Sequence, residues 1–371
     1  MEYIFEDILE IKNGKNQKAV ENPDGKYPIY GSGGVMGYAD DYICEPDTVI
    51  IGRKGNINNP IYVDEAFWNV DTAFGLQAKR EVLNPRYLFY FCKRFDFEKL
   101  NKTVTIPSLT KSDLLKIKID LPGTDEQLDI VEKLTKLEGV IDLRKQELNK
   151  LDELIKARFV ELFGDPVSNP MKWPVKMLKD LSVQINSGNT PKGGSENYVE
   201  EGITFFRSQN VWKDRLEMDD IAYIDAKTHA SMKRSSLKHG DILMTKTGRI
   251  NTENSSLGRA ALYDGEDDMA NVNGHVYFIR LKDGVNNKFI LRILVSPEYR
   301  DLIRSVCVGG IDKRQLNKEH IEDFPIICPP TDMVDDYVAF VEQVDKSKVV
   351  VQKALDKVQL LFDSLMQEYF G

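Results

Sequence analysis

Three kinds of residue string in this sequence could belong to a catalytic site. Asn59-Pro60-Ile61-Tyr62 is near the Asn-Pro-Pro-Tyr motif of adenine N6-methyltransferases, but its third position is Ile and no glycine-rich cofactor loop follows a strand upstream. We interpret it as a turn that starts a strand. Gly31-Ser32-Gly33-Gly34 lacks the Lys-Ser/Thr pair of a P-loop. The four histidines have no paired nucleophile; they are His229, His239, His275 and His320. We therefore predict no catalytic site.

Length and composition are those of a folded protein with two or three domains. The chain has 371 residues, of which 42% are hydrophobic and 29% charged. We expect no membrane span and no signal peptide, because no apolar stretch approaches about 20 residues and the first residues are not basic. The cysteines form no Cys-x-x-Cys pair, and they are Cys44, Cys92, Cys307 and Cys328. These features predict a cytoplasmic protein with reduced thiols, no metal and no cofactor of its own.

The net charge of −9 is concentrated in two segments. Segment 125–163 has ten acidic and seven basic residues, and segment 331–371 has eight acidic residues and four lysines. Together these segments hold −7 of the net charge, so the rest of the chain is near neutral. The overall acidity therefore does not exclude a nucleic-acid partner for the other parts.

Both acidic segments have the apolar spacing of long helices that pack along another helix. The residues predicted to form this helix seam alternate at steps of three and four. In the first segment they are Leu134, Leu137, Ile141, Leu148, Leu151 and Ile155. In the second segment they are Val341, Val344, Val351, Leu355, Val358 and Phe362. Polar Arg144, Arg158 and Lys348 interrupt the seam. The general interpretation is core packing, and the specific one is that each helix packs on the other.

The two halves of the chain repeat each other. Leu134 corresponds to Val341 and Leu148 to Leu355 at an offset of 207, and the flanks agree, since Leu121-Pro122 corresponds to Cys328-Pro329 and Leu109 to Leu316. Upstream, loops of different length shift the offset. The matched strings there are Tyr30–Gly34 with Phe206–Asn210, Val49–Gly55 with Ile242–Gly248, and Asn69–Asp71 with Asn271–Asn273.

Each half predicts a globular unit followed by a long helix. Short β-rich runs are expected at Thr48–Ile51, Ile203–Phe206 and Val276–Ile279. One amphipathic helical stretch is expected before each long helix, at Pro85–Leu100 and Lys288–Val306. The predicted domains are 1–124, a long helix at 125–163, 164–330 with a linker at its start, and a second long helix at 331–371.

At this level the chain resembles the specificity subunits of type I restriction–modification systems over its full length. Leu121–Gln127 is similar to the family's L-P-P-x-x-E-Q string at the start of its helix, and Phe159–Pro166 is similar to the string at the end. Two positions depart from the family pattern. The Glu-Gln pair is lost at Cys328–Met333, and Arg53-Lys54-Gly55 stands where many relatives have a Ser/Arg-Ser-Gly string.

The resemblance implies an α+β fold with a pseudo-two-fold internal repeat, in which two long antiparallel helices separate two target-recognition domains. It implies double-stranded DNA as a partner, two methyltransferase (modification) subunits, and in some systems restriction subunits. The methyltransferase partner is expected to use S-adenosylmethionine. Because the two globular units differ in sequence, the recognised DNA sequence should be bipartite and asymmetric. A segment of 39 residues would be about 58 Å long as a helix, enough to space two reading domains.

Residues for DNA contact are expected where Lys and Arg can reach phosphates and where Arg, Asn or Gln can reach base edges. In the first unit they are Gly31, Ser32, Gly33, Gly34, Arg53, Lys54, Thr103, Thr105 and Ser108. In the second unit they are Arg207, Ser208, Gln209, Asn210, Lys246, Thr247, Arg249, Lys313 and Arg314, followed by Gln315. Each of these residues singly could equally be part of a solvated surface.

Two other functions remain open at this point. One is a scaffold whose helices bind proteins and whose globular units do not bind DNA, which predicts no salt-dependent affinity for DNA. The other is a stand-alone methyltransferase or nuclease, which would need a cofactor or metal site that the sequence does not show. The repeat favours a non-catalytic subunit that reads DNA sequence.

Overall fold

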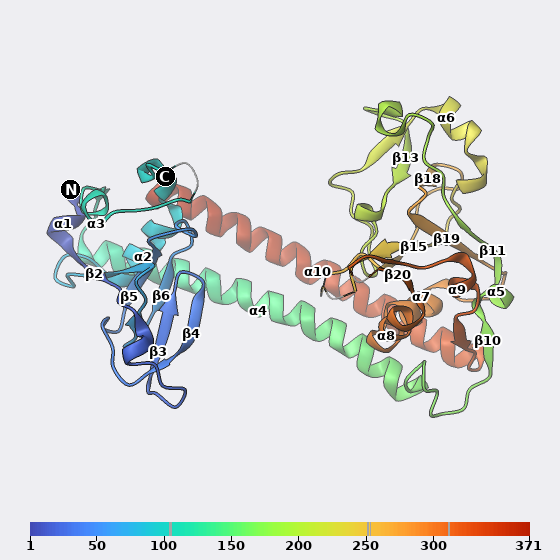
Figure 1. Cartoon of the computed structure of the whole chain (residues 1–371), viewed down its shortest axis with the longest axis horizontal. Helices are drawn as coiled ribbons and strands as arrows, with labels where there is room; N and C mark the ends of the chain where they lie inside the picture. Colours follow the sequence, from blue (N-terminus) through green and yellow to red (C-terminus); the bar gives the residue numbers. More distant parts are fainter. Residues whose placement is uncertain (104–105, 251, 253, 311) are drawn as a thin grey trace. The chain divides into compact units, whose positions relative to one another are not determined.

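The structure is a computed structural model that describes residues 1–103, 106–250, 252, 254–310 and 312–371. Internal contacts divide it into two compact units. The first unit comprises Met1–Asn149 and Val349–Gly371, and the second comprises Lys150–Lys348. The long helices α4 (Thr124–Phe163) and α10 (Thr331–Phe370) each contribute a segment to both units (Figure 1). The units therefore divide the chain differently from the four predicted segments.

The first unit has two main sheets, and the larger one shares its core with the α4 and α10 segments. The larger sheet is antiparallel in the order β2-β8-β5-β6 (Leu9–Asn13, Ala73–Ala78, Thr48–Gly52, Ile61–Val63). The smaller sheet is β4-β3-β7 (Gly34–Ala39, Tyr27–Gly31, Trp68–Asn69), and β1 (Glu2–Ile4) pairs with β9 (Lys118–Asp120). The α-helices are α1 (Phe5–Ile8), α2 (Pro85–Arg94) and α3 (Lys111–Leu114).

The second unit repeats this plan with added elements. Its larger sheet is β11-β19-β15-β17 (Ser182–Ser187, Val276–Leu281, Ile242–Thr245, Ala260–Leu262). A second sheet is β12-β14-β13-β18 (Tyr198–Val199, Ala222–Ile224, Ile203–Phe206, Ala270–Val272). A third is β16-β21-β20 (Thr247–Gly248, Arg314–Gln315, Val308–Gly309), and β10 (Val175–Met177) pairs with β22 (Pro325–Ile327). The α-helices are α5 (Leu178–Leu181), α6 (Ala226–Ser231), α7 (Asn287–Val295), α8 (Pro297–Val306) and α9 (Lys318–Glu322).

Two glycines confirm the predicted internal repeat at atomic detail. A Cβ atom on Gly14 would lie 1.8 Å from the carbonyl oxygen of Val70, and one on Gly188 would lie 1.8 Å from that of Val272. No side chain fits at either position, because carbonyl backbone occupies the space. The same close approach therefore constrains both units.

Strand pairing corrects one detail of the predicted repeat. The Val70 N–H donates to the Tyr30 carbonyl oxygen, and the Asn273 N–H donates to that of Phe206, both at 3.0 Å. Tyr30 and Phe206 therefore correspond as predicted, and Val70 corresponds to Asn273. The predicted match of Asn69 with Asn271 is one residue off, because the shared Asn-Val letters occur one residue out of structural register.

The predicted strands at Thr48–Ile51, Ile203–Phe206 and Val276–Ile279 are confirmed as β5, β13 and β19. The two predicted single helical stretches are wrong, because each is broken in two. In the first unit Asp96 caps a separate 3-10 turn, η2 (Phe97–Leu100), by accepting a hydrogen bond from the Glu98 N–H. In the second unit Ser296 caps α8 and precedes Pro297, which ends the preceding helix.

In the first unit the apolar stripes of the two long helices join one core with α2. Leu134 and Ile141 of α4 are buried with Leu355 and Phe362 of α10. The remaining predicted seam residues of this unit are partly buried against the same core; they are Leu137, Leu148 and Val358, and Val351 is 7% exposed. The two segments run antiparallel, since Lys133 lies near Glu368 whereas Ile141 shares a cavity wall with Gln359.

In the second unit an aromatic cluster joins the helices. Phe163 of α4 lies 5.1 Å from Phe289 of α7 and 5.5 Å from Tyr337 of α10, measured between ring centroids. The predicted seam residues Ile155, Val341 and Val344 belong to the same core, with Leu151 packed against it.

The polar residues predicted to interrupt the seam form ion pairs. In the second unit Lys348 Nζ lies 2.6 Å from an oxygen of Asp152. Arg144 and Arg158 pair along their own helix with Glu147 at 2.6 Å and Glu161 at 2.8 Å. The interrupting charges are thus satisfied without entering the apolar core.

The two long helices begin differently, as the loss of the Glu-Gln pair in the second half indicates. Gln127 is 1% exposed; its amide nitrogen donates to the carbonyl oxygens of Val82 and Pro122, and its oxygen accepts from the Asn84 N–H. The counterpart of Gln127 is Val334, which is buried among apolar side chains. Three hydrogen bonds therefore attach α4 to its unit where α10 uses apolar packing.

Candidate nucleic-acid interface

In the first unit, predicted residues from two distant parts of the chain meet along one backbone edge. The Arg53 N–H donates to the Thr72 carbonyl oxygen at 2.8 Å, and the Leu109 N–H donates to the Arg53 carbonyl oxygen at 3.0 Å. Lys54 is bridged to Ser108, and the side chains of Arg53 and Lys54 are exposed. We call Arg53, Lys54 and Ser108 the first edge.

The second unit builds the same edge from different residues. The Lys246 N–H donates to the His275 carbonyl oxygen at 2.8 Å, and the Leu316 N–H donates to the Lys246 carbonyl oxygen at 2.9 Å. Thr247 pairs with Gln315, and Gly248 pairs with Arg314. We call Lys246, Thr247, Arg314 and Gln315 the second edge. Lys54 and Ser108 thus correspond to Thr247 and Gln315.

An aromatic ring supports the leading cation of each edge. The Arg53 guanidinium carbon lies 5.7 Å from the Phe74 ring centroid, and the Lys246 ammonium nitrogen lies 5.7 Å from that of Tyr277. Such a contact contributes about 0.5–1 kcal/mol at an exposed site and orients the charge. Both units therefore hold one cation at a fixed place at the start of the edge.

The predicted glycine loop is the turn between β3 and β4. Gly31 pairs with Gly34, which has a φ of 114°, and Ser32 and Gly33 form the tip. A Cβ atom on Gly52 would lie 3.1 Å from the Ser32 Cβ, so this turn adjoins the residue before Arg53. The structure thus brings the turn and the first edge together.

The predicted polar loop before Leu109 is organised by Asn101. Its side-chain oxygen accepts from the N–H groups of Thr103 at 3.0 Å and Ser108 at 3.1 Å. Lys102 Nζ lies 2.9 Å from Asp113 and holds the pKa of that carboxyl below its usual value. Thr105 lies outside the described residues.

The predicted Arg207–Asn210 string is largely engaged within the second unit. Arg207 pairs with Asp220 at 3.1 Å and its side chain is only 18% exposed. Gln209 donates to the same carboxylate at 2.9 Å, while Ser208 starts a 3-10 turn. Hydrogen bonds from Gln209 and Arg207 hold the pKa of Asp220 below its ordinary value. In this conformation Arg207 is not free to reach DNA.

Asn210 has a structural role in this turn. It is 1% exposed, accepts from the Arg207 N–H, and donates to the carbonyl oxygens of Glu217 and Asp220. Of the other predicted cations, Arg249 and Lys313 are exposed, and Arg314 is half-buried and donates to the Cys307 carbonyl oxygen at 3.4 Å.

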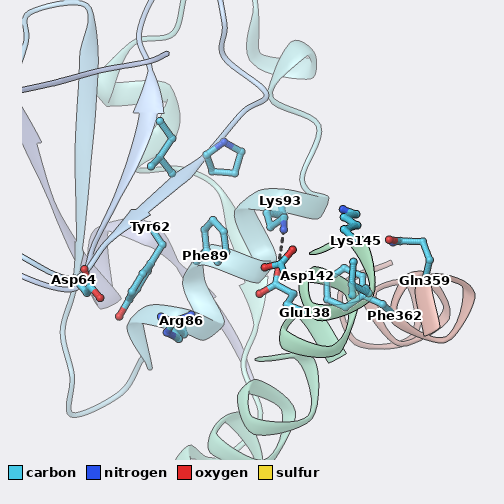
Figure 2. A pocket seen from close by; sticks show the side chains of 13 residues that line it. Tyr62, Asp64, Arg86, Phe89, Lys93, Glu138, Asp142, Lys145, Gln359 and Phe362 are labelled. Carbon is cyan, nitrogen blue, oxygen red and sulfur yellow. Dashed lines mark hydrogen bonds and ion pairs between the residues drawn. The ribbon is translucent and has the colours of Figure 1, made fainter. Parts of the chain in front are cut away.

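A mixed-charge groove of about 510 Å³ lies in the first unit, where β6 and α2 face the long helices. Figure 2 shows Tyr62, Arg86 and Phe89 on one side and Glu138, Asp142 and Lys145 of α4 on the other, with Gln359 and Phe362 from α10. Lys93 pairs with Glu138 at 2.8 Å, and Arg86 lies 4.4 Å from the Tyr62 ring centroid. Burial, with the hydrogen bond to Asp47, raises the pKa of Tyr62 to about 12.

The second unit has a groove of about 1,090 Å³ at the corresponding place, where β17 and α7 face α10. Its wall includes Leu262, Lys288, Arg292, Asp345 and Lys348. Arg292 lies 3.6 Å from Asp345, the repeat counterpart of Glu138 in the first groove. The grooves are thus repeat-related, although their side chains differ.

The strings that could suggest catalysis have structural roles. Asn59 and Pro60 precede β6, as the turn interpretation predicts. His229 hydrogen-bonds Asn271 at 2.5 Å, and His320 accepts from the Asn317 N–H at 3.2 Å. Within the described part of the chain, no cluster of His, Cys, Asp or Glu could hold a metal ion. In the same part, no helix is long and apolar enough to span a membrane.

A repeated pair of mixed α+β domains, each with a long helix and an exposed polar edge, defines a modular binding protein. The chain belongs to the family described as type I restriction modification DNA specificity domain, whose model matches residues 2–153 and 170–358. Members of this family are non-catalytic subunits that bind DNA and assemble with methyltransferase and restriction subunits.

Relatives and solved structures agree with this family. The chain is 23% identical to a putative type I restriction enzyme specificity subunit of Haemophilus influenzae, over 98% of this chain and 92% of the relative. It is 21% identical to the EcoBI specificity subunit of Escherichia coli, over 93% and 77%. The fold is similar to a crystal structure of the type I S subunit of M. genitalium, with a TM-score of 0.63, 16% identity, and coverage of 100% of this chain and 96% of that one.

Proposed function

We propose that this chain recognises an asymmetric, bipartite DNA sequence, one half by each unit, and directs methyltransferase subunits to it for adenine N6 methylation. One observation carries this proposal. The two edges share their backbone hydrogen bonds, yet Lys54 and Ser108 in one are replaced by Thr247 and Gln315 in the other. A constant frame with different polar side chains suits the reading of two different half-sequences.

Two copies of the methyltransferase are proposed as partners, with S-adenosylmethionine held by those subunits. Support comes from the repeat-related grooves, since equivalent places in two units can receive the same surface twice. In systems that cleave, restriction subunits would join the same assembly. The alternative of a scaffold that does not bind DNA is disfavoured by the family.

The experiment is a genome-wide map of N6-methyladenine in the parent strain and in a strain that lacks this gene. We expect methylation to disappear at one split, asymmetric motif in the deletion strain. An unchanged map, with this protein and a partner methyltransferase both expressed, would contradict the proposal.

Two matched variants test which edge contacts the bases of each half-sequence. Ser108→Ala and Gln315→Ala change corresponding positions of the two edges, so we expect each to relax base preference in one half of the motif only. A lost base contact costs about 1–3 kcal/mol, which is roughly 5- to 150-fold in discrimination. If both variants altered the same half, the assignment of one half to each unit would be wrong.

A further inference from the structure

Six basic side chains gather in the second unit around Trp212, outside the predicted DNA-contact residues. We call this set the Trp212 cluster; it consists of Lys156, Lys213, Arg215, Arg259, Arg300 and Arg304. The Arg259 guanidinium carbon lies 3.8 Å from the Trp212 ring centroid, and that of Arg215 lies 5.4 Å from it. One aromatic side chain therefore holds two cations close together.

Helix α8 adds two further cations. A Cβ atom on Gly258 would lie 2.8 Å from Ile303 Cγ2, so the backbone that carries Arg259 packs directly on α8. Arg304 directly follows Ile303 and Arg300 lies three residues before it; the two arginines are four residues apart, which places them on one side of the helix.

Electrostatic effects show that these cations act on one another. Burial, and then the charges of Arg300, Arg259, Lys156 and Arg304, lower the pKa of Lys213. The pKa of Arg259 is likewise lowered, first by burial and then by Arg300 and Arg215.

The hydrogen bonds of Arg259 leave its charge without a carboxylate partner among the described residues. Arg259 donates to the carbonyl oxygens of Ser255, at 3.0 Å, and Asn254, which are neutral acceptors. Arg304 and Arg215 pair with Asp301 at 3.2 Å and Glu217 at 2.5 Å. Asp214, next to Lys213 in the chain, is paired with Arg292 instead. In a chain of net charge −9 this is a marked concentration of positive charge.

Hydrogen bonds from side chains to backbone carbonyl groups connect the Trp212 cluster to the second edge. Arg314 donates to the Cys307 carbonyl oxygen at 3.4 Å, and the Cys307 thiol donates to the Arg304 carbonyl oxygen at 3.1 Å. A duplex read by the second edge would continue toward α8. Guanidinium and ammonium groups bind phosphate oxygens regardless of base sequence.

We propose that the Trp212 cluster binds phosphates of the DNA backbone beside the half-sequence read by the second unit. This inference rests on the proposed function and adds a sequence-independent anchor to it. The first unit has only the single turn η2 where the second has α8. The anchor therefore belongs to one unit and makes DNA binding unequal between the two.

The test uses the complex of this chain with its methyltransferase subunits and compares Lys213→Gln with Lys227→Gln, an exposed lysine on α6. Affinity for a random-sequence duplex and for a duplex with the methylated motif is measured over a series of salt concentrations. We expect Lys213→Gln to weaken both affinities several-fold and to reduce the slope of log K against log salt by about 0.9, the value for one lost phosphate contact. Lys213→Arg should retain both the affinity and the slope, and Lys227→Gln should match the parent.

Each contrary result has a distinct meaning. An unchanged slope in Lys213→Gln, with the preference for the motif intact, overturns the phosphate anchor and leaves the proposed function standing. A loss confined to the motif duplex overturns it in favour of base reading. Reduced co-purification with the methyltransferase subunits overturns it in favour of a protein contact. A parent complex with no salt-dependent DNA binding overturns both proposals.

Discussion

The first and second units share a backbone plan but stabilise it with different side chains. Thr48 and Gln77 face each other on β5 and β8 of the first unit, and they correspond to Asp241, directly before β15, and Arg280 of β19 in the second unit. Asp241 is 1% exposed and lies 2.7 Å from Arg280, whereas the buried Thr48 donates to the Glu45 carbonyl oxygen. The close glycine approaches and edge hydrogen bonds are constant, so the comparison teaches that backbone geometry carries the fold while side chains are free to diverge.

The largest difference in stability between the two units is expected where the end of a long helix packs in each unit's core. Phe163 and Phe370 are repeat counterparts, but Phe163 is fully buried between Phe289 and Tyr337, whereas Phe370 is half-buried beside Tyr87. We expect Phe163→Ala to lower the free energy of unfolding of the second unit by about 3–5 kcal/mol, and Phe370→Ala to lower that of the first unit by about 1–2 kcal/mol.

Hydrogen exchange of peptides from each unit, followed by mass spectrometry in increasing urea, measures the two effects separately. Equal losses in the two variants would show that the units do not differ at this contact.

A smaller difference in stability between the units is expected from the buried ion pair of the second unit. Asp241→Asn should leave the Arg280 charge without its carboxylate and cost about 3 kcal/mol of unfolding free energy in that unit. Installing the first unit's pair, as Asp241→Thr with Arg280→Gln, should recover much of this loss because both charges are removed together. The same exchange experiment checks both variants, and a double variant as unstable as the single one would contradict the explanation.

The smallest expected effect is a change in DNA affinity that depends on Arg207. Its pairing with Asp220 persists at neutral pH, since the lowered pKa of Asp220 keeps the carboxylate ionised there. Asp220→Asn should release Arg207 and raise affinity for a random duplex a few-fold, about one phosphate contact.

Asp219→Asn is the matched control, because it removes the same charge from the exposed neighbour of Asp220. Adding Arg207→Ala should cancel the gain in Asp220→Asn. If Asp219→Asn gave the same gain, net charge alone would account for it.

The repeat made much of the fold predictable from sequence. Apolar spacing at steps of three and four located α4 and α10, and β-rich runs located β5, β13 and β19. The same repeat indicated the segments that form the two edges, because matched strings in both halves imply matched places in the fold. Whether those edge residues contact DNA stays a prediction.

Features that depend on tertiary contacts were not predictable. The break between α7 and α8 follows from a Ser-Pro cap that the amphipathic spacing hides. Asn210 has the side chain of a base reader, but a 3-10 turn buries it. Lys213 and Arg259 are isolated cations in the sequence, and only folding brings both beside Trp212 and α8. A tryptophan followed by the two basic residues Lys213 and Arg215 was the available signal.

The first unit is built from two separate segments of the chain, and this has a consequence for biosynthesis. Its segments Met1–Asn149 and Val349–Gly371 are separated by the whole second unit, so a ribosome makes roughly 200 residues between them. At 5–20 residues per second this is a delay of roughly 10–40 s. Throughout it, Leu134 and Ile141 lack the α10 side chains that cover them in the finished protein. The nascent chain therefore exposes apolar side chains of α4 to chaperones until Val349–Gly371 has been translated, although most of the first unit is synthesised early.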